Sequence, residues 1–319
     1  MYISRGTLDD LLHEVLDRLL KEKQSFTASR GCFTEMFGCC LHLRNPRARL
    51  SRSEGKGKVF SALGELFWYL SGDNKLDFID YYVPDRFQKE SDDQVRVRSG
   101  YGGRLFSIRG INQLQNVIRV LTDKPTSRRA VIQLFDATDL DGHYASIPCT
   151  CSLQFLGRDG YLHLFVSMRS NDAYIGLPHD VFAFTMLQEL VARSTGMEVG
   201  EYKHCAGSLH LYDQDRESAE GYLKEGWQAS IFMPAMPRGD PWKSVMELQR
   251  LEEALRMGKG IDVKHSSLDE YWKDLARLLK ALRASKDQEK EVLMELMDEM
   301  DSSVYKMFIE ARADRLIGT

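Results

Sequence analysis

The sequence has no apolar run that approaches the ~20 residues a helix needs to cross a membrane. Its start, Met1 to Asp10, lacks a basic region followed by an apolar stretch, so we expect no signal peptide. An excess of positive charge is also missing. Because the formal net charge is −4, neither a nucleic acid nor a membrane surface is expected as a partner. An anionic small molecule remains a candidate ligand, since it needs only a local cluster of arginines.

The sequence lacks the common zinc motifs, because the spacing of its six cysteines does not fit them. Cys149 and Cys151 form C-x-C rather than C-x-x-C, so no metal site is expected. A chain of this length can bury a core of its own and does not need disulfides. Together with the missing signal peptide, these features favour a reducing, cytoplasmic location.

The residues that are present have an ordinary balance for a globular protein, with 43% apolar and 28% charged side chains. Helical and strand-like patterns are mixed along the chain, which predicts an α+β fold. Helices are expected at 7–20, 60–70, 111–121 and 181–193, and strands at 31–43, 130–135, 152–156, 161–168 and 209–212. The segments 152–156 and 161–168 should form a hairpin around 157–160.

The composition changes after about Gly226, where a cluster of helix breakers (233–241) precedes charged, helical sequence. We therefore divide the chain into a mixed α and β domain, residues 1–235, and a helical C-terminal extension, residues 236–319. The extension is expected to begin a helix at the pair Asp240–Pro241, and another at a capping box formed by Ser267 and Glu270.

Cys149, within SIPCTC (146–151), is the strongest candidate for a catalytic side chain. An isolated cysteine is more often a small buried hydrophobe, but this cysteine has polar motifs on both sides in the sequence. SRR (127–129) precedes the cysteine, and RSND (169–172), GLPHD (176–180) and HLY (210–212) follow it. ELFWYLSG (65–72) adds a glutamate to an otherwise apolar helical segment.

In this order and spacing, the motifs resemble the thymidylate synthase superfamily over roughly residues 25–215. The resemblance implies a thymidylate synthase-like mixed β-sheet core with packed helices. It implies that 5,10-methylenetetrahydrofolate donates a one-carbon unit to C5 of a pyrimidine nucleoside monophosphate. It also implies a homodimer with shared active sites. The extension after residue 226 lies outside this resemblance.

The resemblance assigns catalytic roles to particular residues. Cys149 is expected to add to C6 of the base and so to activate C5, and Arg169 to lower the pKa of this thiol. Tyr101 matches a tyrosine linked to proton removal at C5. Glu65 matches an acid–base residue that orders water and assists the folate.

Further residues receive binding roles. Arginines are expected at the phosphate because a guanidinium can bind it in a bidentate way. A histidine and a tyrosine two positions apart on a strand face the same side, where the family binds the ribose. The phosphate residues are Arg30 and Arg169, with Arg128 and Arg129 from a second subunit; the ribose pair is His210 and Tyr212; Ser170, His179 and Asp180 are expected at the nucleotide and Asp172 at the pterin.

The sequence departs from the family at Asp180, where the synthases carry asparagine after G-L-P-F. An asparagine amide complements N3–H and O4 of uracil, whereas a carboxylate accepts from the N4 amine of cytosine. A carboxylate can also stabilise a protonated N3 in the covalent intermediate, which gives Asp180 a catalytic role as well. Aspartate here resembles the dCMP and CMP hydroxymethylases, so we expect a cytidylate substrate. The alternative is that Asp180 only caps a helix that starts at Val181.

Other departures concern the product and the folate. Residues 81–87 lack the tryptophans that shield the exocyclic methylene in the family, which favours attack by water and a hydroxymethyl product. Thr150 replaces a histidine, and the loop 48–53 differs from the usual lysine-bearing loop. The sequence leaves dCMP and CMP open. Two alternatives also remain: a thymidylate synthase acting on dUMP, and a catalytically idle paralogue that binds nucleotide or RNA.

Overall fold

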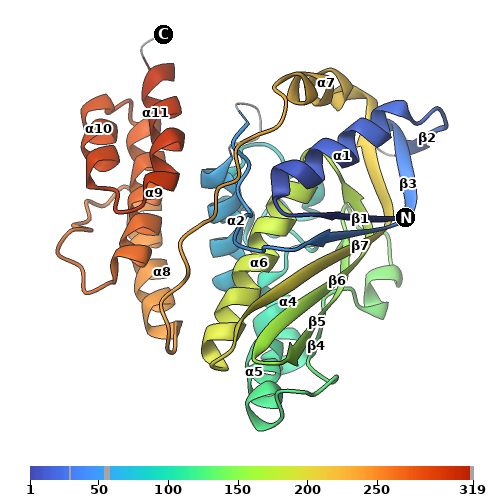
Figure 1. The fold of residues 1–319 in the computed structure, drawn as a ribbon, viewed down its shortest axis with the longest axis horizontal. Helices are drawn as coiled ribbons and strands as arrows, with labels where there is room; N and C mark the ends of the chain where they lie inside the picture. Colours follow the sequence, from blue (N-terminus) through green and yellow to red (C-terminus); the bar gives the residue numbers. More distant parts are fainter. Residues whose placement is uncertain (29, 54–57, 317–319) are drawn as a thin grey trace.

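The computed structural model describes residues 1–28, 30–53 and 58–316, and its centre is a mixed β-sheet (Figure 1). The strand order is β1-β3-β7-β6-β5-β4, and β2 pairs with β3 off this path. The pairs β1–β3 and β6–β7 are parallel and the others antiparallel. The strands are Tyr2–Arg5 (β1), Ser25–Ala28 (β2), Gly31–Leu43 (β3), Val131–Gln133 (β4), Thr150–Arg158 (β5), Tyr161–Asp172 (β6) and Glu198–Tyr212 (β7).

Helices pack in layers away from the sheet: α6 lies on the sheet, α2 on α6, and the C-terminal helices beyond α2 (Figure 1). The predicted α+β class is therefore confirmed. The helices are Leu8–Lys21 (α1), Val59–Leu70 (α2), Leu76–Tyr82 (α3), Gly102–Phe106 (α4), Gln113–Asp123 (α5), Gly176–Ser194 (α6), Arg216–Lys224 (α7), Trp242–Arg256 (α8), Glu270–Lys286 (α9), Lys290–Glu299 (α10) and Lys306–Arg315 (α11). None of the helices in the described residues is long and apolar enough to span a membrane.

Local signals in the sequence set several boundaries. Thr7 caps α1 by accepting a hydrogen bond from the amide of Asp10 at 3.1 Å. The β5–β6 hairpin turns at Asp159 and Gly160, whose φ angles of 51° and 80° suit a tight turn between twisted strands. Strand β3 has the predicted limits.

Strand β7 begins eleven residues before the predicted segment 209–212, and its glycines explain why the pattern was missed. A Cβ on Gly200 would lie 2.8 Å from the ring of His163, and one on Gly207 would lie 2.9 Å from the carbonyl of Arg169. Both glycines therefore let neighbouring strands approach, but they interrupt the strand signal in sequence. Cys40 and Cys205 face each other across β3 and β7 and form a disulfide, which the composition did not predict.

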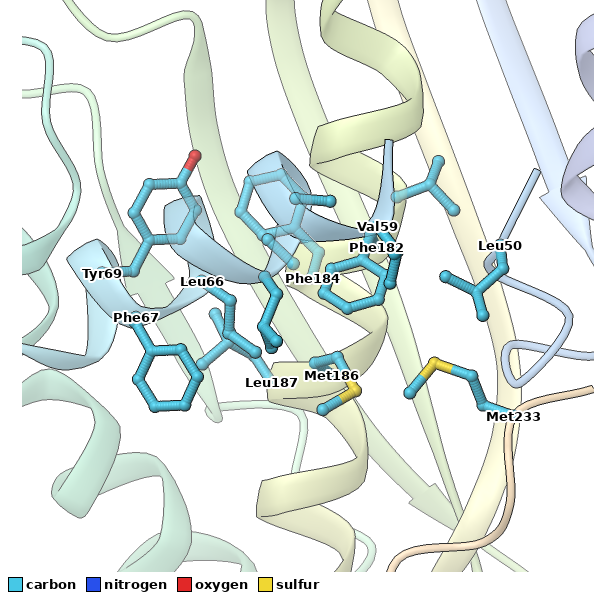
Figure 2. Close-up of a cluster of buried hydrophobic side chains, with 14 of the residues drawn as sticks. Leu50, Val59, Leu66, Phe67, Tyr69, Phe182, Phe184, Met186, Leu187 and Met233 are labelled. Atoms are coloured by element: carbon cyan, nitrogen blue, oxygen red, sulfur yellow. The ribbon is translucent and has the colours of Figure 1, made fainter. Parts of the chain in front are cut away.

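Helix α6 begins at Gly176, five residues earlier than predicted, with Pro178 in its first turn. The helix is buried on almost every side and packs on α2. Figure 2 shows this contact, in which Phe182, Phe184, Met186 and Leu187 meet Val59, Leu66, Phe67 and Tyr69, with Leu50 and Met233 at one end. Because both helices are held by apolar contacts along their length, side chains at their ends are placed firmly.

The extension packs against the side of α2 and α3 that faces away from the sheet. Buried Tyr82 donates to Glu252 of α8 at 2.7 Å, and Gln249 donates to the carbonyl of Leu70 at the end of α2. The guanidinium of Arg312 lies over the ring of Phe60, 4.5 Å from its centroid. The extension thus shares a core with residues 1–235.

Two predicted helix starts in the extension differ from the structure. The capping box of Ser267 and Glu270 is wrong: α9 begins at Glu270 after Asp269, and no side chain caps it. Helix α8 begins at Trp242, whose amide makes a long 3.4 Å hydrogen bond to Asp240. The start of α9 is held by packing rather than by a cap, because Tyr271 and Trp272 in its first turn are buried.

A buried ion pair joins the loop before α2 to α6. Arg49 donates to Glu189 at 2.5 Å, both side chains are fully buried, and the other carboxylate oxygen accepts from the amide of Met236. We expect Arg49→Met to lower the free energy of unfolding by about 3–5 kcal/mol, because the charge of Glu189 is left without its partner. Urea denaturation measures this loss.

The double variant Arg49→Met/Glu189→Gln is the control. It removes both charges but keeps an acceptor for the amide of Met236, and we expect it to recover at least half of the lost stability. A loss under about 1 kcal/mol in the single variant would show that the pair contributes little.

Candidate active site

A cavity of about 790 Å³ lies where β6 and β7 end and α6 begins, a volume that suits a nucleotide-sized ligand. Helix α2 and the loop before β5 form its other walls. Every predicted site residue except Arg128 and Arg129 lines this cavity: Arg30, Glu65, Tyr101, Cys149, Arg169, Ser170, Asp172, His179, Asp180, His210 and Tyr212.

Cys149 sits immediately before β5, next to Arg169 on β6. The backbone amide of Arg169 donates to the carbonyl of Cys149 at 2.8 Å, which ties the two residues together through the sheet. The guanidinium donates to the carbonyls of Pro148 and Ile147 at 3.0 and 3.1 Å and to the thiol sulfur at 3.7 Å. Arg169 is therefore held rigidly with one nitrogen directed at the sulfur.

The pKa of the Cys149 thiol is raised, and not lowered as the sequence predicts. Enclosure in the cavity is the largest cause, and Asp180 and Glu90 add to it, whereas Arg169 and Arg30 oppose it. The arginine does act in the predicted direction. Its effect is outweighed because the thiolate loses solvation and faces two carboxyl groups.

The rate of Cys149 alkylation by iodoacetamide should therefore rise with pH to a midpoint above ~8.5, the ordinary value for cysteine. In Glu90→Gln the midpoint should fall, because a carboxylate that disfavours the thiolate is gone. Peptide mass spectrometry separates Cys149 from exposed Cys32. A wild-type midpoint below the ordinary value for cysteine would contradict this assignment of causes.

Glu90 is a cavity residue that the sequence analysis missed. It ends a short 3₁₀ turn, Gln88–Glu90, and forms an ion pair with Arg30. A phosphate brought to Arg30 would compete with this carboxylate. The motifs held no signal for Glu90, because it approaches Arg30 only through the fold.

Asp180 lies inside the first turns of α6 and not at its N-cap, so the alternative that it merely caps a helix is excluded. Its side chain is buried at 8% exposure and lines the cavity. Oδ2 accepts from Nδ2 of Asn171 at 2.7 Å. Burial raises the pKa of Asp180 well above its ordinary value, with Glu65 adding to the effect and Asn171 opposing it.

His179 uses both ring nitrogens within the protein. Nδ1 donates to the carbonyl of Ile175 at 3.0 Å, which leaves Nε2 to accept from the hydroxyl of Ser61 on α2 at 2.9 Å. Burial lowers the pKa of His179, in keeping with a neutral ring. His179 thus lines the cavity and links α6 to α2.

Two tyrosines place hydroxyl groups beside the catalytic candidates. Tyr69 donates to Glu65 one helical turn away at 2.5 Å. Tyr101 lies 2.8 Å from the hydroxyl of Thr150 and accepts from the Thr150 amide at 3.2 Å. Burial raises the pKa of both tyrosines. Thr150, the departure next to Cys149, thus holds Tyr101.

The ends of β6 and β7 carry the remaining predicted residues. His210 stands opposite Asp172, and Ser170 Oγ lies 3.5 Å from His210 Nδ1. His210 and Tyr212 line the cavity together, as their alternation predicts. Oδ1 of Asp172 accepts from the amides of Tyr174 and Ile175, both at 2.9 Å.

Helix α2 contributes Trp68 to the cavity wall, where its ring packs 5.4 Å from that of Phe87. The segment 81–87 lacks tryptophan, but this part of the cavity does not. The missing tryptophans of 81–87 therefore favour an open methylene less than the sequence suggests. Trp68 was visible in ELFWYLSG, but only the fold shows which way it faces.

Arg128 and Arg129 lie outside the cavity, exposed on the segment that leads into β4. The two arginines therefore do not contribute to the site of their own subunit. Among the described residues no group of three side chains is arranged to hold a metal ion.

The α+β fold gathers a thiol, arginines and carboxyl groups around one cavity, an arrangement suited to a group-transfer enzyme with an anionic substrate. The sequence pattern of the thymidylate synthase family matches residues 52–235, which is over half of the chain. The chain belongs to this family, and the predicted superfamily is confirmed. Its members are folate-dependent one-carbon transferases that act at C5 of pyrimidine nucleotides.

Proposed function

We propose that this chain converts cytidylate, either dCMP or CMP, to 5-hydroxymethylcytidylate, with 5,10-methylenetetrahydrofolate and water as co-substrates. The observation that carries the proposal is the buried carboxyl of Asp180 in the same cavity as Cys149. A carboxyl group can donate a hydrogen bond to N3 of cytosine and accept one from the N4 amine, so it complements this base. A buried mismatch with uracil is costly.

The residues of the chain support covalent catalysis on the base. The thiolate of Cys149 adds to C6, and electron density moves to C5, while the positive charge of Arg169 stabilises the thiolate that must form first. Asp180 binds the N3 side of the ring and balances the positive charge of a protonated N3. Tyr101, held by Thr150, would orient a water that takes the proton lost by C5, because its own buried hydroxyl stays protonated.

The folate supplies a one-carbon unit at the oxidation level of formaldehyde, and the cavity fits it. Oδ1 of Asp172 is used by two backbone amides, which leaves Oδ2 for N–H groups of a pterin. Trp68 and Phe87 offer an aromatic wall for stacking. Glu65, held by Tyr69, is the group that would order the attacking water.

The product assay tests this assignment. The protein is incubated with methylenetetrahydrofolate and dCMP, CMP or dUMP, and products are identified by mass spectrometry. A hydroxymethyl product from a cytidylate supports the proposal. A methyl product, or turnover of dUMP alone, would assign the chain to the synthase reaction instead. Tritium release from [5-³H]-labelled nucleotides separates both from an idle paralogue, which releases none.

We further propose a homodimer with shared sites, in which Arg128 and Arg129 reach the phosphate bound by the other subunit. Their place outside the cavity of their own chain supports this. The double variant Arg128→Ala/Arg129→Ala should be nearly inactive, as should Cys149→Ser. Mixed and re-equilibrated, the two should regain about a quarter of wild-type activity, because half of the dimers are mixed and each has one intact site.

A mixture that stays inactive, although size analysis shows exchanged dimers, would contradict site sharing. Arg119→Ala/Lys124→Ala, which changes two charges that do not line the cavity, is the matched control and should stay active. We also propose residues 1–235 as the catalytic domain and 236–319 as an extension that supports α2 and α3.

A further inference from the structure

Behind Asp180 a chain of buried polar side chains runs across β6 and β7. Asn171 donates from Nδ2 to Asp180, and its Oδ1 lies 3.0 Å from Nε2 of His204. Nδ1 of His204 lies 2.8 Å from the hydroxyl of Tyr202. Asn171, His204 and Tyr202 are 3%, 1% and 1% exposed, and only Asn171 touches the cavity.

The direction of these hydrogen bonds is set at the far end of the chain. Burial raises the pKa of Tyr202 well above its ordinary value, so its hydroxyl keeps its proton. Among the described residues, His204 is the sole hydrogen-bonding partner of this hydroxyl. The hydroxyl must therefore donate to Nδ1, because a buried hydroxyl hydrogen without an acceptor is costly.

The remaining steps follow from this direction. Burial lowers the pKa of His204 to about 3, so its ring is neutral and carries one hydrogen. With Nδ1 accepting, that hydrogen is on Nε2 and is donated to Oδ1 of Asn171. The amide is thereby oriented with its NH2 group toward Oδ2 of Asp180.

We propose that Asn171, oriented by His204 and Tyr202, is a positioning residue that fixes Oδ2 of Asp180 as an acceptor and so sets the choice between cytosine and uracil. The hydroxyl oxygen of a carboxylic acid is a poorer acceptor than its carbonyl oxygen. A proton on the Asp180 side chain therefore belongs on Oδ1 and not on the oxygen that faces Asn171.

This inference rests on the proposed cytidylate substrate, which places N3 opposite Oδ1. A proton on Oδ1 is then donated to N3 of cytosine, while Oδ2 accepts from the N4 amine. Uracil presents N3–H and O4 at the same places, so it would need the proton on Oδ2. The donor chain opposes that arrangement, and uracil meets a donor with a donor and an acceptor with an acceptor.

Equilibrium binding tests the proposal without requiring turnover. Dissociation constants are measured by calorimetry for matched nucleotides, dCMP with dUMP and CMP with UMP, using the sugar that binds more tightly. The measured quantity is the ratio of the uridylate to the cytidylate constant. We expect Asn171→Leu to lower this ratio at least about tenfold. Tyr202→Phe, two links from the cavity, should lower it about threefold.

His204→Gln is the conservative control. Glutamine can accept from Tyr202 and donate to Asn171, so the ratio should stay within about twofold of wild type. A merely structural role would weaken both nucleotides equally and leave the ratio unchanged in every variant. If Asn171→Leu fails to fold, Tyr202→Phe decides, since it removes one oxygen atom. An unchanged ratio in folded Tyr202→Phe would overturn the proposal.

The two assignments fail in different ways. A wild-type protein that binds uridylate more tightly would overturn the cytidylate substrate. If the ratio still moves tenfold in Asn171→Leu and in the same direction in Tyr202→Phe, the donor chain sets base choice regardless. A cytidylate preference that none of the variants alters would leave the substrate standing and remove the role of Asn171.

Discussion

Replacing Asp180 with asparagine should lower turnover of cytidylate by about two to three orders of magnitude and so shift base preference toward uracil. The amide of an asparagine at position 180 cannot transfer a proton to N3 and take it back. It also cannot balance the positive charge of a protonated ring. The shift is measured as the ratio of kcat/KM for cytidylate and for uridylate of the same sugar. An unchanged ratio would remove the basis for the cytidylate assignment.

Gain of uridylate turnover needs a second change. The NH2 group of Asn171 favours an oxygen at the Oδ2 position, so it holds a new amide in the orientation that suits cytosine. The double variant Asp180→Asn/Asn171→Leu frees that amide to turn. We expect it to use uridylate faster than either single variant does.

Replacing Cys149 with serine should reduce turnover by at least about four orders of magnitude while nucleotide binding stays within severalfold of wild type. A serine hydroxyl is a far weaker nucleophile toward C6 than a thiolate. The groups proposed for phosphate and ribose, Arg169 and Tyr212 among them, are unchanged. Tritium release from the labelled nucleotide measures turnover, and calorimetry measures binding.

Cys151→Ser is the matched control. Cys151 lies in β5, two residues after Cys149, and does not line the cavity, so this variant should keep its activity. Loss of binding together with activity in Cys149→Ser would mean that the cysteine has a structural role only.

The sequence predicted which residues gather around Cys149 better than it predicted their interactions. The order of the short motifs resembles that of a known family and so predicted a shared cavity for Arg169, Asp172 and His210. The raised pKa of the thiol was not predictable, since it depends on enclosure and on Glu90, which no motif includes.

The donor chain behind Asp180 was out of reach for a related reason. Asn171 and His204 are 33 positions apart and meet only through the parallel pairing of β6 and β7. The start of β7 was itself missed, because Gly200 and Gly207 interrupt the strand pattern. The helix predicted at 7–20 was found at Leu8–Lys21, whereas the capping box predicted at Ser267 and Glu270 does not form.

Helix α2 has one face in the cavity and the other against the extension. Glu65 and Trp68 project from the first face, while Phe60 and the carbonyl of Leu70 are engaged by Arg312 and Gln249 on the second. The extension therefore stabilises the position of helix α2, which carries Glu65. A substitution at Arg312 or Gln249 can therefore disturb the position of Glu65, although neither residue lines the cavity.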